Sequence, residues 1–107
     1  LMPDYDHRPC QKVSFEEGKP AKTIFKLLRN VQCGSSECAL MLLQPVTGRT
    51  HQLRVHCAHH LGLNVPIVGD TLYGATAERL MLHASYVSFR HPVSGRRVEF
   101  SSLAPFQ

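Results

Sequence analysis

The chain has 107 residues, of which 43% are hydrophobic and 19% charged, and this composition is typical of one small globular domain rather than a disordered segment. Its formal net charge of +4 favours an anionic partner such as nucleic acid, although moderately basic domains of other functions are common. No apolar run approaches the roughly 20 residues that a transmembrane helix needs, and no stretch has the pattern of a signal peptide. We therefore expect a cytoplasmic protein with no membrane partner.

The first half of the chain has the pattern of extended segments joined by turns. Residues 11–15 are expected to form a short strand. The alternation of residues 21–28 predicts a longer strand, and the polar stretch 30–37 predicts a hairpin loop. The apolar run 38–43 predicts a strand that is buried on both faces. These two longer strands should pair as an antiparallel ladder.

One good helix is expected after this hairpin. Thr50 is placed to cap its start through the side-chain hydroxyl. Leu53, Cys57 and Leu61 then recur at every fourth position, which predicts a buried helical stripe. Gly62 is well placed to end the helix in a left-handed conformation.

The second half predicts two further strands, over residues 80–89 and 96–101, with a tight connection at 91–95. Asp70 is expected to cap the turn that holds Tyr73. Together, the predicted strands and helix indicate an α+β fold with a mainly antiparallel sheet and one principal helix.

Four cysteines stand at positions 10, 33, 38 and 57, without a Cys-x-x-Cys pair. A zinc site built from Cys33, Cys38, Cys57 and a histidine has poor ligand spacing. His56 and His60 lie one helical turn apart, but a solvated histidine face explains them better than a metal site. We therefore expect no metal, and we expect Cys57 to be a small buried hydrophobic residue.

Five short motifs follow one another along nearly the whole chain. Residues 18–23 read GKPAKT, 48–56 read GRTHQLRVH, and 66–74 read PIVGDTLYG. Residues 79–84 read RLMLHA, and 89–92 read FRHP. In this order the motifs resemble the RluA-type family of RNA pseudouridine synthases. The resemblance implies that the sheet and helix are part of a pseudouridine synthase catalytic fold.

The resemblance also implies a reaction. Enzymes of this family detach uracil from its ribose, turn it and rejoin it through carbon 5, with no cofactor and no metal. Their essential aspartate is carried in a His-Arg-Leu-Asp motif, but His7-Arg8 of this chain is followed by Pro9-Cys10. We therefore expect residues 1–107 to be a single partial domain, the C-terminal half of a catalytic domain. It should be inactive without the missing N-terminal half, its partner within the same protein.

Arg54 is the residue that the resemblance places in the catalytic site, as the ion-pair partner of the absent aspartate. A guanidinium within about 4 Å lowers the pKa of a carboxyl group, and its planar fork fixes the orientation of the carboxylate. The alternative for Arg54 is an exposed helix arginine. Gln52 is expected to brace the site through hydrogen bonds. Asp70 is not assigned as the catalytic acid, because its motif favours capping.

The remaining candidate residues concern RNA, which the resemblance implies to be tRNA or rRNA. The candidate RNA contacts are Arg49, His51, Lys19 and Lys22. Arg49 and His51 either touch RNA phosphate or brace the cleft, and a bond from His51 to a backbone carbonyl is an equal alternative. The candidate substrate pocket has Leu82 in its apolar floor, and His83 faces the cleft or sits in a buried network. The alternative function is a non-catalytic RNA-binding module of the same fold, which should bind RNA in a salt-dependent way.

Overall fold

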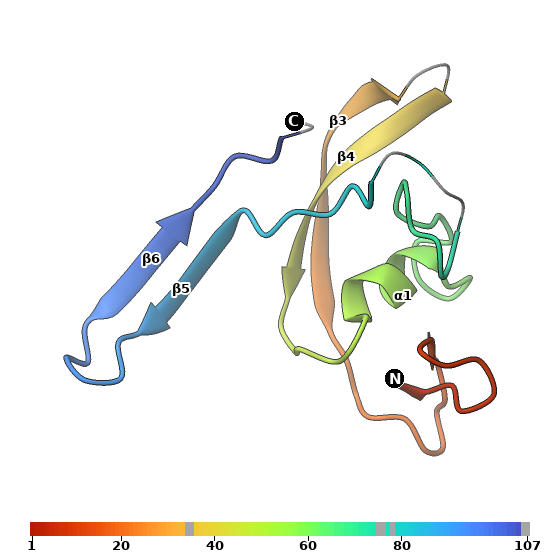
Figure 1. Cartoon of the computed structure of the whole chain (residues 1–107), viewed down its shortest axis with the longest axis horizontal. Helices are drawn as coiled ribbons and strands as arrows, with labels where there is room; N and C mark the ends of the chain where they lie inside the picture. Colours follow the sequence, from red (N-terminus) through yellow and green to blue (C-terminus); the bar gives the residue numbers. More distant parts are fainter. Residues whose placement is uncertain (34–35, 75–76, 78, 106–107) are drawn as a thin grey trace.

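The computed structural model describes residues 1–33, 36–74, 77 and 79–105. In this part of the chain there are three antiparallel strand pairs and one short helix, which lies beside the β3–β4 pair (Figure 1). The elements in chain order are β1 (Met2–Pro3), β2 (Gln11–Lys12), β3 (Thr23–Cys33), β4 (Ser36–Pro45), α1 (Gln52–Ala58), β5 (Tyr86–Arg90) and β6 (Arg97–Ser101). The predicted α+β class with mainly antiparallel strands is thus confirmed. None of the helical residues described forms a helix long and apolar enough to cross a bilayer.

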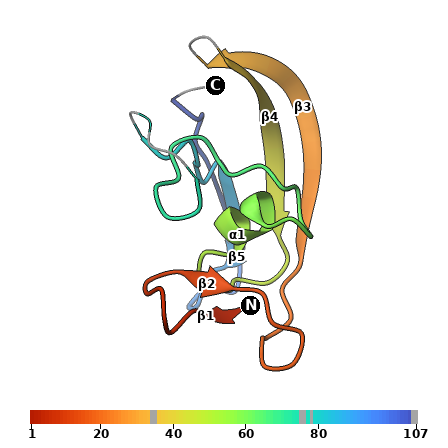
Figure 2. The same cartoon turned by 90° about the vertical axis from the view of Figure 1, so that its right-hand side faces the viewer.

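The β3–β4 hairpin is the largest element, and α1 lies on the concave side of its curve (Figure 2). The ladder runs from the pair Thr23–Pro45 to the pair Cys33–Ser36, with a shift of register between Leu27 and Arg29. Residues 30–33 belong to β3 and residues 36–37 belong to β4, so the prediction of a hairpin loop over residues 30–37 is wrong for these residues. Residues 34–35 of that predicted loop lie outside the described part of the chain. Polar side chains are tolerated in these strands because this end of the hairpin faces solvent.

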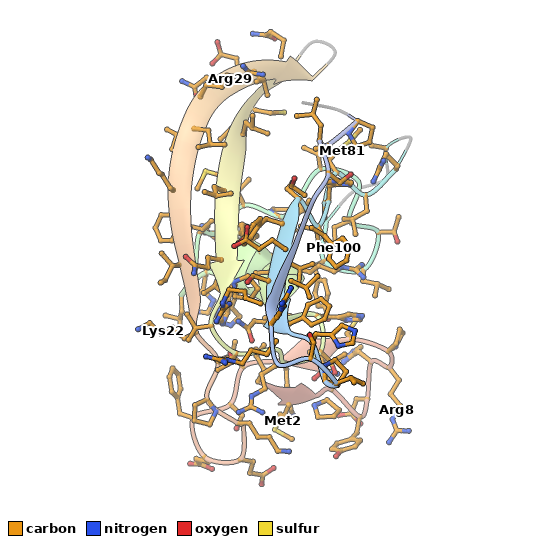
Figure 3. The ribbon with its side chains drawn as sticks, turned by 90° about the vertical axis from the view of Figure 1, so that its left-hand side faces the viewer. Met2, Arg8, Lys22, Arg29, Met81 and Phe100 are labelled. Carbon is orange, nitrogen blue, oxygen red and sulfur yellow. The ribbon has the colours of Figure 1, made fainter. Side chains whose placement is uncertain are left out.

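The hairpin also differs from expectation in its burial. Leu42 on β4 is 52% exposed, so the strand predicted over residues 38–43 to be buried on both faces is not. Phe25 on the paired strand β3 is 57% exposed. The reason is that α1 covers only one end of the ribbon. Figure 3 shows Lys22 at this end of the hairpin and Arg29 toward the other.

Helix α1 is shorter than predicted and begins differently. Its N-cap position is His51, in a left-handed conformation with φ 54° and without a side-chain capping bond, so the predicted Thr50 cap is wrong. The helix ends at Ala58 because the chain turns back over its end. The amides of Leu63 and Val65 donate to the carbonyls of His56 and Cys57, at 3.0 and 2.8 Å, and so satisfy carbonyls that a longer helix would bond.

The predicted helical stripe is confirmed only in part. Val55 and Cys57 are buried, as expected for Cys57, whereas Leu61 lies in the turn and is 62% exposed. Gly62 follows in the same turn, where its amide donates to the carbonyl of His59. It therefore does not end the helix.

The last two strands form a separate hairpin. The strand predicted over residues 80–89 begins only at Tyr86, because the preceding segment bonds elsewhere: the amide of Met81 donates to the carbonyl of Val68 at 2.8 Å. The tight connection at 91–95 is confirmed, with Gly95 at φ +71°. The short strand expected over residues 11–15 covers only Gln11–Lys12, paired with β1.

Candidate active site at the start of helix α1

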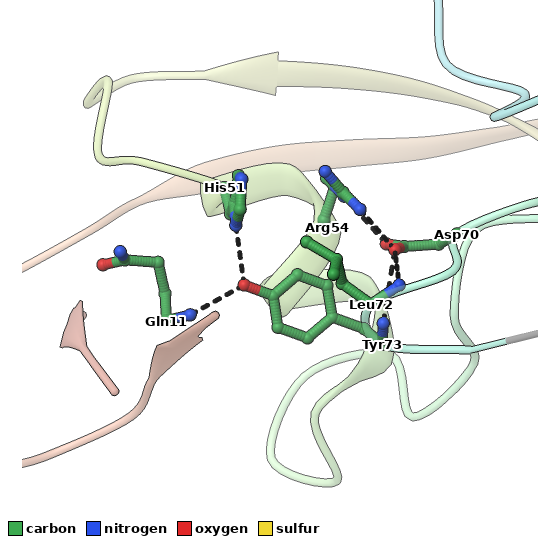
Figure 4. Close-up of polar contacts among 6 residues, drawn as sticks. All are labelled: Gln11, His51, Arg54, Asp70, Leu72 and Tyr73. Carbon is green, nitrogen blue, oxygen red and sulfur yellow. Dashed lines mark hydrogen bonds and ion pairs between the residues drawn. The ribbon is translucent and has the colours of Figure 1, made fainter. Parts of the chain in front are cut away.

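An ion pair joins helix α1 to the loop of residues 66–74 (Figure 4). Arg54 Nε donates to Asp70 Oδ2 at 3.0 Å, and Arg54 Nη2 donates to Asp70 Oδ1 at 2.6 Å. The side chain of Asp70 has 0% exposure and that of Arg54 has 19%. Two parallel bonds from a guanidinium to a carboxylate fix both groups in one orientation. Arg54 is thus not the exposed helix arginine of the alternative interpretation.

The same carboxylate organises its own loop. Asp70 Oδ1 also accepts from the amides of Leu72 and Tyr73, at 3.1 and 3.3 Å. The predicted capping role of Asp70 is therefore confirmed. Sequence reasoning missed its contact with Arg54. The sequence offers one indication of this contact: a buried carboxylate requires a cationic partner, and the motif of residues 48–56 supplies Arg54.

The pair is ionised at neutral pH. Burial alone would raise the pKa of Asp70, but the hydrogen bonds from Arg54 and from the amides of Leu72 and Tyr73 outweigh it and hold the pKa below its usual value. The pKa of Arg54 is raised, mainly by its hydrogen bond to Asp70. Each charge therefore stabilises the other in a site that excludes most solvent.

The lowered pKa of Asp70 predicts acid-sensitive stability. Because the folded-state pKa lies below the unfolded value of 3.8, the ionised carboxylate stabilises the fold above that value. This stability is lost as the pH falls through the folded-state pKa. Urea unfolding measured from about pH 7 to about pH 3 should therefore show a steeper loss of stability in the wild type than in Asp70→Asn.

The comparison with Asp70→Asn removes the carboxylate and keeps its titratable neighbours. His51, Tyr73 and Cys57 lie within electrostatic range of the pair and are present in both proteins. The pKa of His51 is itself lowered, so its protonation also destabilises the fold in acid. This effect is larger in Asp70→Asn, where the opposing charge of Asp70 is absent, so a steeper loss in the wild type is attributable to the carboxylate of Asp70. Parallel pH profiles for the two proteins would contradict the prediction.

Tyr73 connects three parts of the chain (Figure 4). Its ring lies over the guanidinium of Arg54, with Cζ 5.4 Å from the ring centroid. Its hydroxyl oxygen accepts from the amide of Gln11 at 2.8 Å and lies 2.8 Å from Nδ1 of His51. Tyr73 therefore ties strand β2 and the start of α1 to the loop that carries Asp70.

His51 has the geometry of a brace. Its pKa is lowered by burial and by the positive charge of Arg54, against an opposing effect of Asp70, so the neutral ring is favoured. Since the Tyr73 oxygen already accepts from Gln11, its hydrogen is available to donate to Nδ1 of neutral His51. The partner of this ring is thus a side-chain hydroxyl, not the backbone carbonyl of the alternative interpretation.

Replacing Tyr73 with phenylalanine should separate its two roles. The ring over Arg54 stays, while the bonds of the hydroxyl to Gln11 and His51 are lost, and we expect a loss of about 1–2 kcal/mol in the free energy of unfolding. Urea unfolding would measure it, with Tyr86→Phe on exposed β5 as the matched control. Equal stabilities of the two variants would show that the hydroxyl bonds contribute nothing.

Gln52 anchors the first turn of α1 to the hairpin. Its side chain is 3% exposed and makes four hydrogen bonds. Oε1 accepts from the hydroxyl of Thr47 and the amide of Arg49, at 2.6 and 3.1 Å. Nε2 donates to the carbonyl of Lys22 and the hydroxyl of Thr23, at 2.8 and 2.9 Å. The predicted bracing role of Gln52 is confirmed.

The sequence profile of the family described as RNA pseudouridylate synthase matches residues 2–59, which include Arg54 and all of α1. The chain belongs to this family. It is 47% identical over 100 residues to the dual-specificity RNA pseudouridine synthase RluA of Vibrio parahaemolyticus, covering 88% of this chain and 39% of that protein. It is 41% identical over 111 residues to the RluA of Escherichia coli, covering 99% of this chain and 48% of that protein.

These relatives show that the chain is of the RluA type of pseudouridine synthase. The RluA of Pasteurella multocida is 40% identical over 111 residues. The chain spans about half the length, or less, of the curated relatives that it matches. No solved structure matches it significantly.

The other candidate residues of this pseudouridine synthase chain fall into two groups. Arg49 lies beside the helix start, where its Nε donates to the carbonyl of Pro20 at 2.9 Å, so it braces this corner. Lys19 and Lys22 are exposed near the same corner. The structure thus brings these basic residues to the helix entry, and their contact with RNA stays a prediction.

Leu82 and His83 belong to the segment that precedes β5. His83 Nε2 is 3.1 Å from the hydroxyl of Ser102, and Leu82 is half-buried. In the part of the chain that is described, no hydrogen bond links either residue to Arg54 or Asp70. Their place in a substrate pocket stays a prediction. Among these described residues there is also no group of three or more metal-ligating side chains.

Proposed function

We propose that the protein carrying this chain isomerises uridine to pseudouridine in tRNA or rRNA in the cytoplasm. The proposal is supported by the membership of the family and by the relatives, which are dual-specificity RNA pseudouridine synthases. The observation that carries the proposal is how Arg54 is buried and hydrogen-bonded. This arginine of the family motif is ionised, largely buried and held by a two-point bond to Asp70.

Arg54 keeps donors for a second carboxylate. A guanidinium carries five N–H groups, and the bond to Asp70 engages Nε and one hydrogen of Nη2. Among the described residues, Nη1 and the second hydrogen of Nη2 make no hydrogen bond, and one hydrogen of each nitrogen lies on the outer edge of the guanidinium, away from Nε. This edge can bind the essential aspartate of the enzyme, which we place outside this chain, and hold it in the ionised form.

The exposed apolar surface supports a partner segment within the same protein. Large hydrophobic side chains of the β3–β4 hairpin, such as Phe25, Leu27 and Leu42, are about half exposed. Phe25 and Leu27 lie on one face of the hairpin and Leu42 lies on the other. Exposed apolar side chains of this kind are typical of surfaces that another segment covers. We therefore propose that the chain is one half of the catalytic domain and is inactive alone.

The test is to incubate the whole protein with total tRNA and rRNA from a strain that lacks its gene, and to map pseudouridine by position. We expect new pseudouridine with the whole protein and none with residues 1–107 alone. If the whole protein binds RNA in a salt-dependent way but isomerises no uridine, it is the non-catalytic RNA-binding module of the alternative.

A further inference from the structure

In the pair of Arg54 and Asp70, the aspartate is held in place by its own loop, and the arginine is positioned by the aspartate. The side chain of Asp70 has 0% exposure. Its carboxylate accepts hydrogen bonds from two backbone amides of its own loop, those of Leu72 and Tyr73. Arg54 reaches it from helix α1 through a long side chain. The position of the guanidinium is therefore set by groups anchored on the 66–74 loop.

We propose that Asp70 is a positioning residue that fixes the guanidinium of Arg54, so that its outer edge is presented to the catalytic carboxylate in one orientation. This inference rests on the proposed function. The bond through Nε and Nη2 occupies one edge of the planar group and thereby sets the direction of the other edge. The ring of Tyr73 lies over the same plane and limits its rotation.

The negative charge of Asp70 has a second consequence. The pair as a whole is neutral, so it attracts the catalytic carboxylate less strongly than an isolated arginine would. An isolated arginine would lower the pKa of that carboxyl further. Asp70 therefore orients Arg54 and at the same time moderates its electrostatic effect. The titratable groups around the pair are His51, Tyr73, Cys10 and Cys57.

Asp70→Asn in the whole protein is the sharpest test. The amide oxygen can still accept from Leu72 and Tyr73, so the turn is kept, but the NH2 group cannot accept from Arg54. We expect kcat to fall about 100-fold with little change in KM, because a misplaced catalytic partner affects the chemical step. The acid limb of the kcat/KM profile should also move to lower pH, since Arg54 then acts without a compensating charge.

A double-mutant cycle tests whether Asp70 acts through Arg54. In an Arg54→Lys background the fork is already lost, so Asp70→Asn should reduce the single-turnover rate much less than it does in the wild type. An equal reduction in both backgrounds would overturn the inference, because Asp70 would then act on the fold alone. A wild-type rate and pH profile in Asp70→Asn would overturn it as well.

Two controls keep these outcomes separate. Asp6→Asn removes an exposed acid and should leave both the rate and the pH profile unchanged. If Asp70→Asn does not fold, Asp70→Ser keeps a capping oxygen and takes its place in every measurement. A wild-type protein without isomerase activity would contradict the proposed function itself, whereas an active wild type with a fully active Asp70→Asn variant contradicts only this inference.

Discussion

Replacing Arg54 with alanine is expected to remove most of the pseudouridine formed by the whole protein and to destabilise it. The buried carboxylate of Asp70 would lose its cationic partner, and breaking a buried ion pair from one side costs about 3–5 kcal/mol. The rate should fall about 100- to 1,000-fold, the effect typical of losing one charged group that stabilises the reacting site.

Urea unfolding and position-specific pseudouridine mapping would measure the two effects. Arg54→Lys is the informative second variant, because it keeps the charge and loses the fork. It should recover part of the stability and little of the rate. Arg29→Ala, on the far part of the β3–β4 hairpin, is the matched control and should unfold like the wild type (Figure 3). An Arg54→Ala protein as stable as this control would contradict a structural role for the pair.

The sequence predicted the elements that depend on local periodicity. Alternation over residues 21–28 and the apolar run at 38–43 predicted the β3–β4 pair, and the tight connection at 91–95 followed from its glycine. Boundaries were less predictable. Thr50 is a better capping residue than His51, but the N-cap position belongs to His51, whose ring is held by the hydroxyl of Tyr73. A tertiary contact of this kind cannot be inferred from local helix and capping propensities.

The candidate site was predictable from its motif, but its geometry was not. Arg54 and Gln52 were singled out from their place in one short segment, and the structure gives both of them fixed partners. Asp70 was expected only to cap a turn, because its second partner lies 16 positions away on another element. The role of Tyr73 likewise depends on three segments that meet only in the folded chain.

Gln52→Leu is expected to be the second most damaging substitution in this region. Leucine fits a buried helical position, but it satisfies none of the four partners of the glutamine. In the variant, the carbonyl of Lys22 still accepts from the amides of Val46 and Thr47. The hydroxyl of Thr23 still has its hydrogen bond with Nδ1 of His56. The amide of Arg49 loses the one partner that it has among the described residues. We therefore expect a loss of about 2–3 kcal/mol in the free energy of unfolding.

The effect should extend from stability to catalysis, because Gln52 and Arg54 share the first turn of α1. Releasing this turn from β3 lets Arg54 shift relative to the loop that carries Asp70. We expect a lower kcat in the whole protein at temperatures where Gln52→Leu is fully folded, checked by circular dichroism. Gln32→Leu on exposed β3 is the matched control for the same change of side chain. A folded Gln52→Leu protein with the kcat of this control would show that the anchor stabilises the helix without positioning Arg54.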